Sequence, residues 1–562
     1  MTGMAAPSRT PTGRDASPSP PRGPGVGAAL TLAAIVIVAA VARFWGLQFG
    51  LPLVYARPDE LMISDRAITF FRESTLNPEF FDYPSLYLYL TAALYFVYFL
   101  CGLVAGWFDS LSTFIESWAT HWVPFFLIGR TVGAATGTAT VLVVYAIGRR
   151  LFDARTGLVA AAFFALAFLH VRDSHYATTD APMVCLMMIA VLFLVRAYQE
   201  GRTRDHVLAG VFAGLAMATK YNAFLLALPM AALVLFRVWD APGARLEALR
   251  RSRVLHLLVP FGAMFLLASP YVLLDFRQFR HDIAALSGLH TAGMTPPEML
   301  GIGWKYHLIF SLRYGLGLPL LVTGLAGLAF LLARRPRIGV LLAVFPIAYY
   351  LVAGSGYTVY VRYMIPVVPY LCLAGAALVG VVADCVRRLG RGTVVAVTVA
   401  LAACVVWPSA ESVWRFDRLL VERDSRLVAG DWALAHIPPG STIYQAGAIY
   451  GQLQLESSRP FKYRYWVWDE GSFRVSRRPF RWTNDWPDWI VVQESPLPYA
   501  HVSPTVAAKL RHDYALEYAL RVVDLNEPRN VYDVQDAFFL PFAGFEKVRR
   551  PGPNILIYRR RS

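Results

Sequence analysis

The chain has 562 residues, 56% of them hydrophobic and only 16% charged, whereas charged residues make up about one quarter of a typical soluble domain. This composition predicts a polytopic α-helical membrane protein. Lys and Arg number 53 against 38 Asp and Glu, for a formal net charge of +15 at pH 7. The basic residues gather in short loops between apolar runs, so the charge indicates membrane orientation and not a nucleic-acid partner. The five cysteines lack paired spacing and indicate neither a disulfide framework nor a zinc site.

Residues 1–27 are rich in Pro, Gly and Ser and hold almost nothing that a folded core would bury, which predicts a disordered tail. The apolar run at 28–48 lacks a small-residue cleavage site, so we expect a retained first span and not a removed signal peptide. Arg9, Arg14 and Arg22 precede this run. The positive-inside rule then places the tail in the cytoplasm and the chain after the span outside.

Further apolar runs follow before residue 410, most of them long enough to cross about 30 Å of hydrocarbon as helices. They lie at roughly 86–106, 123–148, 157–170, 183–197, 206–219, 222–237, 255–274, 312–333, 338–353, 361–383 and 393–409. Five connections between them carry clusters of arginine, at 149–155, 196–204, 237–253, 334–337 and 387–391. Because positive residues favour the cytoplasmic side, we expect these five loops there.

If every run crossed, the loop at 149–155 would fall outside, against the positive-inside rule. The run at 86–106 is the best candidate for a helix that lies along the outer surface, because Trp107 and Trp118 beside it are typical of a membrane interface. We therefore predict about eleven transmembrane helices plus outer juxtamembrane helices, with the N-terminus in the cytoplasm and the C-terminus outside. These helices would form a transmembrane domain over 28–410 in the plasma (inner) membrane.

The composition changes after about residue 410. Strand-like segments such as STIYQAG, DWIVVQES and NILIYRR alternate with Pro and Gly turns, and a helical stretch lies near 424–435. These features predict a small extracytoplasmic α/β domain over 411–562. Tyr, Trp and Arg are frequent across 444–487. They suit stacking on sugars, although an ordinary aromatic core explains them slightly better.

Several polar stretches fall on the outer side in this topology although they border membrane spans. They contain Asp59-Glu60, Asp82, the stretch from His175 to Asp180, Lys220 and His290. A charged group at the bilayer centre costs about 2.5–3.5 kcal/mol, so charges kept near a membrane are usually paired or functional. Their shared depth predicts one polar pocket at the outer surface.

Three motifs in this order resemble the GT-C class of glycosyltransferases: VYARPDELMISD at 54–65, FFDYPSLY at 80–87 and ATTDAP at 177–182. The chain is similar over roughly 28–410 to the dolichyl-phosphate-mannose protein mannosyltransferase superfamily and to the aminoarabinose transferases that modify lipid A. The resemblance implies an inverting enzyme that moves a sugar from a polyprenyl-phosphate donor to an acceptor hydroxyl on the extracytoplasmic face. In that class, the first outer loop and the loop after the third span supply acidic residues to one pocket.

Such a reaction needs a carboxylate that takes the proton of the acceptor hydroxyl, and cations or oriented donors around the departing phosphate. By its place in the matched motif, Asp59 is the predicted base, and Glu60 would orient it, bind the acceptor or help hold a cation. Asp180 is the second predicted carboxylate, orienting the sugar or the acceptor. The plain alternatives are a helix N-cap for Asp180 and a solvated surface charge for Asp59.

Eight further residues are predicted to bind the donor or the acceptor: Asp82, Tyr83, His175, Tyr176, Lys220, His290, Arg362 and Tyr363. Lys220, Arg362 and Arg130 are the candidate cations, with Lys220 expected near the donor phosphate. His290, in an outer loop over 275–303 with Gly293, would touch phosphate or close over the donor. Their plain alternatives are a snorkelling anchor for Lys220, turn chemistry for Asp82 and a solvated loop residue for His290.

No cofactor is clearly required by these residues. A divalent cation held by Asp59, Glu60 and Asp82 through oxygen ligands stays open, although the protein-mannosylating relatives are generally regarded as metal-independent. Beside membrane lipid and the lipid-linked donor, the expected partner is an acceptor that could be a glycan, a lipid or a protein. The rival interpretations are a transporter or lipid flippase, with broken helices and polar groups near the mid-membrane, and a noncatalytic scaffold.

Overall fold

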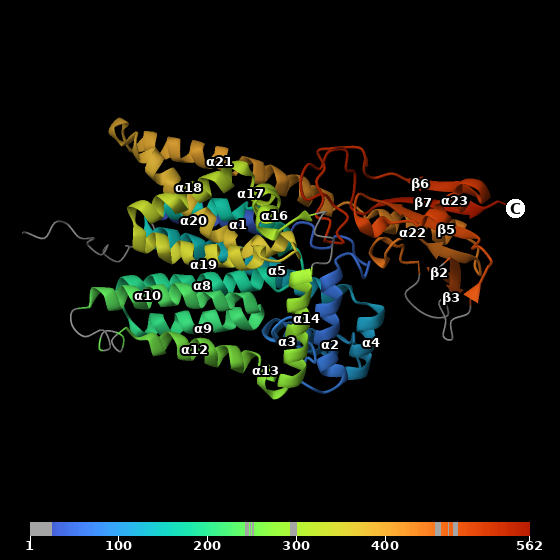
Figure 1. Ribbon diagram of the computed structural model, residues 1–562, viewed down its shortest axis with the longest axis horizontal. Coiled ribbons are helices and arrows are strands. Elements are labelled where there is room, and N and C mark those ends of the chain that lie inside the picture. Colours follow the sequence, from blue (N-terminus) through green and yellow to red (C-terminus); the bar gives the residue numbers. More distant parts are fainter. Residues whose placement is uncertain are drawn as a thin grey trace, which may run out of the picture.

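A computed structural model describes residues 25–561 except 242–246, 248, 250–251, 293–299, 456–461, 470 and 476–481. Long helices run along one axis and form a bundle, and a β-sheet region lies at one end of it (Figure 1). The protein is therefore a polytopic helical membrane protein with a C-terminal mixed sheet. The predicted tail falls almost entirely outside the described residues.

Each of the eleven predicted spans contains a helix. The bundle consists of α1 (Val26–Phe44), α5 (Val123–Leu151), α6 (Ala154–Ala165), α8 (Asp180–Glu200), α9 (Thr203–Thr219), α10 (Ala227–Asp240), α12 (Val254–Ala268), α18 (Leu318–Arg334), α19 (Pro336–Gly354), α20 (Val368–Asp384) and α21 (Arg391–Leu420). These helices form because unbroken apolar sequence buried in hydrocarbon must satisfy its backbone hydrogen bonds internally.

The number of crossings differs from the predicted eleven. Within the described ranges, eight helices are long and apolar enough to cross a membrane, or up to ten if each of two bent helix pairs counts as one span. The prediction is too high by this measure because α9 and α12, with 17 and 15 residues, are shorter than the 20 or so that a straight crossing needs. The first bent pair, α6 and α7 (Phe168–Ser174), turns by 58°.

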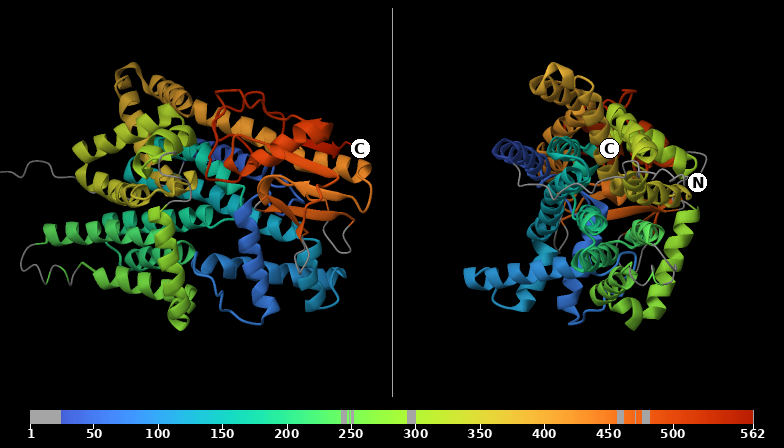
Figure 2. Two further views of the ribbon diagram at one scale, coloured as in Figure 1. Left: turned by 45° about the vertical axis from the view of Figure 1, so that its right-hand side comes forward. Right: turned by 90° about the vertical axis from the view of Figure 1, so that its left-hand side faces the viewer.

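The helix at the predicted surface run is α3 (Leu86–Ala105). Its 20 residues are apolar enough to span, so it is one of the eight helices counted above. In Figures 1 and 2, however, it runs across the long axis of the bundle, beside α2 (Pro58–Arg72) and, like α14 (Phe276–Ala292), at an angle to the long helices. This arrangement favours a helix along the membrane surface.

The five arginine-rich loops lie together at one end of the bundle, because ion pairs and hydrogen bonds join them in series. Arg150 pairs with Glu200 at 2.7 Å, and Arg155 pairs with Asp384 at 2.9 Å. Arg237 donates to the carbonyl oxygens of Ala197 and Tyr198, while Arg337 pairs with Asp240 at 2.5 Å. The shared side predicted for these loops is therefore confirmed, and its assignment to the cytoplasm stays a prediction.

The break between α6 and α7 is stabilised by polar side chains from two other helices. Arg43 of α1 donates to the carbonyl oxygens of Phe164 and Ala165 at 3.2 and 2.9 Å. Ser409 of α21 accepts from the backbone N–H of Phe168 and donates to the carbonyl of Leu166. Backbone groups freed by a helix break need such partners inside a membrane protein. The turn positions α7, whose residues reappear in the site below.

The C-terminal region is a seven-stranded sheet in the order β4-β3-β2-β1-β5-β7-β6, with β1 parallel to β2 and β5 and the other pairs antiparallel. The strands are β1 (Thr442–Gln445), β2 (Arg464–Asp469), β3 (Ser472–Val475), β4 (Trp482–Thr483), β5 (Trp489–Glu494), β6 (Tyr514–Leu520) and β7 (Asn554–Arg560). Helices α22 (Ser425–His436) and α23 (Pro504–Asp513) pack into separate hydrophobic clusters with the sheet. The aromatic residues Tyr444 and Tyr463 belong to these clusters, as expected of an ordinary core.

Two predicted boundaries change. Helix α21 continues to Leu420, so the helical bundle extends beyond the expected limit near residue 410. The predicted outer loop over 275–303 is wrong for its first half, which forms α14 up to Ala292; Gly293 lies outside the described residues. Helix α21 continues past its apolar run, whereas α14 is a separate helix after α13 (Tyr271–Leu274). A polar helix gives no hydrophobic signal in the sequence, which explains both differences.

The topology can be tested with single cysteines placed in a cysteine-free variant. Position 202 lies beside the joined arginine loops and position 431 lies on α22, and the side chains there are 67% and 58% exposed. We expect a membrane-impermeant maleimide to label Arg202→Cys only in inside-out vesicles and Asp431→Cys only in intact spheroplasts. Labelling of both from one side would contradict this orientation.

Candidate active site

The predicted acidic motif begins a helix at the end of the bundle that faces the sheet region. Pro58 opens α2 after Arg57, and Asp59 and Glu60 occupy its first turn. Proline is favoured at this position, and carboxylates in the first turn are stabilised by the partial positive charge of the helix N-terminus. The sequence therefore fixes where these two carboxylates start, and their surroundings decide their roles.

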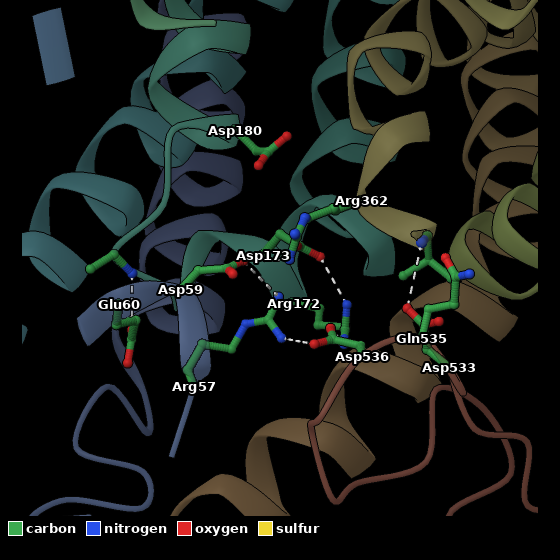
Figure 3. A network of polar contacts seen from close by, with 12 residues as sticks. Arg57, Asp59, Glu60, Arg172, Asp173, Asp180, Arg362, Asp533, Gln535 and Asp536 are labelled. Carbon is green, nitrogen blue, oxygen red and sulfur yellow. Dashed lines mark hydrogen bonds and ion pairs between the residues drawn. The ribbon is translucent and has the colours of Figure 1, made fainter. Parts of the chain in front are cut away.

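Asp59 lies between two guanidinium groups. Its Oδ2 is 2.5 Å from Nη1 of Arg362 and 3.9 Å from Nη2 of Arg57. Its side chain is 22% exposed, whereas that of Arg57 is fully buried. Figure 3 shows Asp59 and Arg362 approaching from opposite sides of the network, on α2 and on the segment that precedes α20. Asp59 is thus held between two cations and stays partly exposed.

Glu60 has a different environment. It is fully buried and forms a two-bond ion pair with Arg130 of α5, at 2.8 and 2.7 Å. Its Oε1 also accepts from the backbone N–H of Ala177 at 3.0 Å, and Arg130 donates further to the carbonyl oxygens of Leu47 and Phe49. Glu60 therefore ties α2 to α5 and to the turn before α8, which suits the orienting role among those predicted for it. Arg130, one of the candidate cations, is occupied by this ion pair and by the two carbonyl oxygens.

Asp180 begins α8 but does not cap it by a side-chain hydrogen bond. Its Oδ1 accepts instead from Nζ of Lys220 at 2.7 Å, and both side chains are less than a tenth exposed. Lys220 Nζ also lies 5.7 Å from the centre of the Tyr363 ring. The predicted acid, cation and aromatic residue are therefore neighbours, although they come from three separate elements.

Tyr83 connects this group to Asp59. Its hydroxyl is within electrostatic reach of Asp59, Arg362 and Asp180, and burial together with the two carboxylates raises its pKa well above the usual value. Asp82 turns toward α14: burial and the charge of Asp282 raise the pKa of Asp82. Asp82 and Tyr83 are adjacent in one motif but face different surroundings. Asp82 faces α14, whereas Tyr83 borders Asp59.

His175 and Tyr176 are both buried. The two ring nitrogens of His175 lie 3.0 Å from the carbonyl oxygens of Val171 and Trp45, which commits the imidazole to backbone contacts. The Tyr176 ring lies 4.5 Å from the Arg57 guanidinium carbon. His175 is therefore held within the packed bundle end, whereas Tyr176 supports the arginine beside Asp59.

His290 lies on α14 and packs against the loop after α19. Its carbonyl oxygen accepts from the backbone N–H of Tyr357, and its Nε2 lies 3.5 Å from the Ser355 hydroxyl. A second histidine, His307, sits in a π-helical turn (His307–Leu312) with its ring 6.3 Å from that of Tyr363. Its buried Nε2 has no hydrogen-bond partner within the described part of the chain. Short π-helical turns are frequent at functional sites.

Sequence reasoning missed a second layer of charged residues. Arg57 precedes the matched acidic pair, and Arg172 and Asp173 lie just before the ATTDAP turn, so proximity to known motifs was an available signal. Arg172 pairs with Asp173 at 3.2 Å and with Asp536 at 3.1 Å. Asp536 comes from the C-terminal region, in the stretch VYDVQDAFF, whose pattern contains no signal for a membrane site.

The arrangement at one end of the bundle differs from the mid-membrane site expected of a transporter. In the part of the chain that the structure describes, no three His, Cys, Asp or Glu side chains converge as a metal site would need. Glu60 is paired with Arg130, and Asp82 faces Asp282, so the three carboxylates considered for a divalent cation have separate surroundings.

Comparison with known proteins bears on this geometry. Residues 102–273 match the family described as dolichyl-phosphate-mannose-protein mannosyltransferase, a segment that includes Arg130, Asp180 and Lys220. Of the three motifs, ATTDAP lies within this segment, and the match confirms the resemblance that it carries. This part of the chain is similar to that glycosyltransferase family.

The fold of the chain is similar to that of a solved oligosaccharyltransferase. The oligosaccharyltransferase AglB from Archaeoglobus fulgidus, in complex with an inhibitory peptide and a dolichol-phosphate, is 12% identical, with a TM-score of 0.51 over 95% of this chain and 88% of that one. ArnT from Cupriavidus metallidurans in the apo state is 13% identical, with a TM-score of 0.48 over 94% and 97%. The chain spans 58% of the apo archaeal oligosaccharyltransferase, at 14% identity and a TM-score of 0.47 over 73% of its own length. No protein of curated function matches the sequence.

The two adjacent carboxylates, Asp59 and Glu60, should differ in their effect on stability. Glu60→Gln leaves Arg130 buried without its counter-ion, and breaking a buried ion pair from one side costs about 3–5 kcal/mol. Asp59→Asn changes a carboxylate that is 22% exposed, so we expect a smaller loss. The thermal unfolding midpoints of the two purified variants in detergent measure these losses of stability. An equal decrease in the two midpoints would contradict the orienting role of Glu60.

Proposed function

We propose that the protein transfers a sugar from a polyprenyl-phosphate donor to an acceptor hydroxyl, with inversion at the anomeric carbon, on the extracytoplasmic face of the membrane. The observation that carries this proposal is the position of Asp59, which Arg57 and Arg362 flank at the end of a membrane bundle. The donor class is supported by the family that residues 102–273 match. The orientation is supported by the five arginine loops at the opposite end of the helices.

In the proposed reaction, Asp59 accepts the proton of the acceptor hydroxyl while the hydroxyl oxygen forms a bond with the anomeric carbon. The bond from that carbon to the phosphate oxygen breaks, and the phosphate leaves with the electron pair. One displacement from the face opposite the leaving group inverts the anomeric configuration. Asp59 suits the base because its carboxylate is oriented by two cations yet partly exposed.

The leaving phosphate gains charge as the bond breaks, so it needs cations in a poorly solvated place. Lys220 and Arg362 meet this need: both are less than a tenth exposed, and both lie around Tyr83 and Tyr363. Asp180 holds Lys220 at 2.7 Å and is the second carboxylate available to orient a sugar hydroxyl. We assign Glu60 and Arg130 to positioning, because their pair is fully buried.

The test of the base is transfer from a synthetic polyprenyl-phosphate sugar by the purified protein. We expect Asp59→Asn to lower kcat about 10²–10⁴-fold, the usual contribution of a positioned general base, with the fold and donor binding retained. Mass spectrometry of the glycosylated acceptor gives the rate. Full activity of this variant would show that Asp59 is not the base. The control is Lys547→Met, which removes a charge from an exposed ion pair at the surface.

The stereochemical outcome is a separate prediction. A single displacement assisted by one carboxylate turns a β-linked donor into an α-linked product, or the reverse. Proton NMR coupling constants of the anomeric proton in donor and product measure this directly. A product with retained configuration would require a covalent sugar intermediate and would contradict the assignment of Asp59 as a base only.

A further inference from the structure

A stretch of the C-terminal region reaches back to the bundle end that holds Asp59. We define residues 531–546 as the capping segment; in Figure 1 it belongs to the red loops between the bundle and the sheet. Its Phe538 lies 5.4 Å from the ring of Tyr176 and 5.7 Å from that of Phe49. Its Phe542 lies 5.6 Å from the ring of Phe168. Aromatic packing against several elements of the bundle therefore fixes this segment in place.

One carboxylate of the capping segment joins two buried arginines. Asp536 Oδ1 accepts a hydrogen bond from Nη1 of Arg57, and its Oδ2 lies 3.1 Å from Nη2 of Arg172 (Figure 3). Arg57 and Arg172 are 0% and 3% exposed, and Asp536 is 6% exposed. Ion pairs with so little water are strong only while every partner is present.

The same segment also holds the chain just before Arg362. The side-chain oxygen of Gln535 accepts from the backbone N–H of Val359 at 2.7 Å, and Asp533 Oδ2 accepts from that of Val361 at 3.5 Å. Asp533 Oδ1 accepts from the hydroxyl of Tyr306 at 3.4 Å. Both arginines that flank Asp59 thus depend on the capping segment, Arg57 through its side chain and Arg362 through the backbone beside it.

The charges around Asp536 agree with this role. Burial alone would raise the pKa of Asp536, but the guanidinium groups of Arg57, Arg172 and Arg362 outweigh burial and lower this pKa. Burial and the charge of Asp536 raise the pKa of Asp533. The cations therefore favour the ionised form of Asp536, the carboxylate that contacts Arg57.

We infer that Asp536 is a positioning residue for the transfer reaction, fixing the guanidinium group of Arg57 and, through it, the carboxylate of Asp59. Arg57 Nη1 contacts Asp536 while its Nη2 lies 3.9 Å from Asp59, so one planar group links the two carboxylates. The C-terminal region then completes the active site that the membrane helices begin. This inference rests on the proposed function, because it assigns Asp536 to the chemistry of Asp59.

A purely structural role for Asp536 would attach the C-terminal region to the bundle without affecting the chemistry. Separate values of kcat and of the donor KM distinguish the two roles. Replacing Asp536 by Asn weakens the contact that fixes Arg57, so the guanidinium group beside Asp59 loses its orientation and kcat falls while the donor KM changes little. Loose attachment of the domain alone would leave kcat unchanged.

The experiment compares Asp536→Asn with Asp524→Asn in the full-length protein, using transfer from the synthetic polyprenyl-phosphate sugar. Asp524 is a matched control because it is also paired in the C-terminal region, with Lys547 at 2.9 Å, but at the surface. For Asp536→Asn we expect kcat to fall about 10–100-fold and the donor KM to change less than about threefold. Asp524→Asn should match the wild type in both values.

Equal kcat values for the two variants would overturn the inference. Should Asp536→Asn fail to fold, Asp536→Glu decides: wild-type kcat in that variant overturns the inference, and a lower kcat with unchanged donor KM supports it. A wild-type protein that transfers no sugar refutes the proposed function itself. A wild-type enzyme that loses activity in Asp59→Asn but keeps it in Asp536→Asn refutes only the role of Asp536.

Discussion

The need of buried arginines for acceptors governs the construction of this protein. A guanidinium group stays charged at any accessible pH, so its burial requires carboxylates or carbonyl oxygens at hydrogen-bond distance. Arg130 pairs with Glu60, Arg362 pairs with Asp59, and Arg57 and Arg172 both pair with Asp536. Each pair joins elements that are far apart in the sequence. Charge pairing, added to helix packing, therefore brings α2, α5, α7, the start of α20 and the C-terminal region to one place.

Local sequence predicts those features that depend on local physics. Apolar runs predicted the helical bundle, and arginine clusters predicted which loops lie together. The motifs pointed to Asp59 and Asp180, and Lys220 and Arg362 were predicted as cations from other stretches of the chain. The number of spans was harder to predict. Short helices such as α9, and bends such as that between α6 and α7, differ in length from a straight membrane-crossing helix. The helix α14 was missed since a polar helix leaves no hydropathy signal.

The roles within the acidic motif were harder to predict than its position. Asp59 and Glu60 are adjacent, yet one is partly exposed between cations and the other is enclosed with Arg130, because successive residues of a helix point in different directions. Asp536 lies 479 residues after Arg57. A single Asp in a loop-like stretch of the C-terminal region carries no information about a partner at that separation, so only the folded chain reveals it.

The long separation between Arg57 and Asp536 has a consequence for biogenesis. A ribosome makes α2 early and the capping segment much later, after every helix of the bundle. Until the later part has emerged, crossed to the same compartment as α2 and folded, Arg57 and Arg172 have no Asp536 to contact. A nascent or prematurely ended chain would thus be inserted in the membrane with these two arginines lacking that carboxylate, and the proposed active site would form only after the C-terminal region has folded.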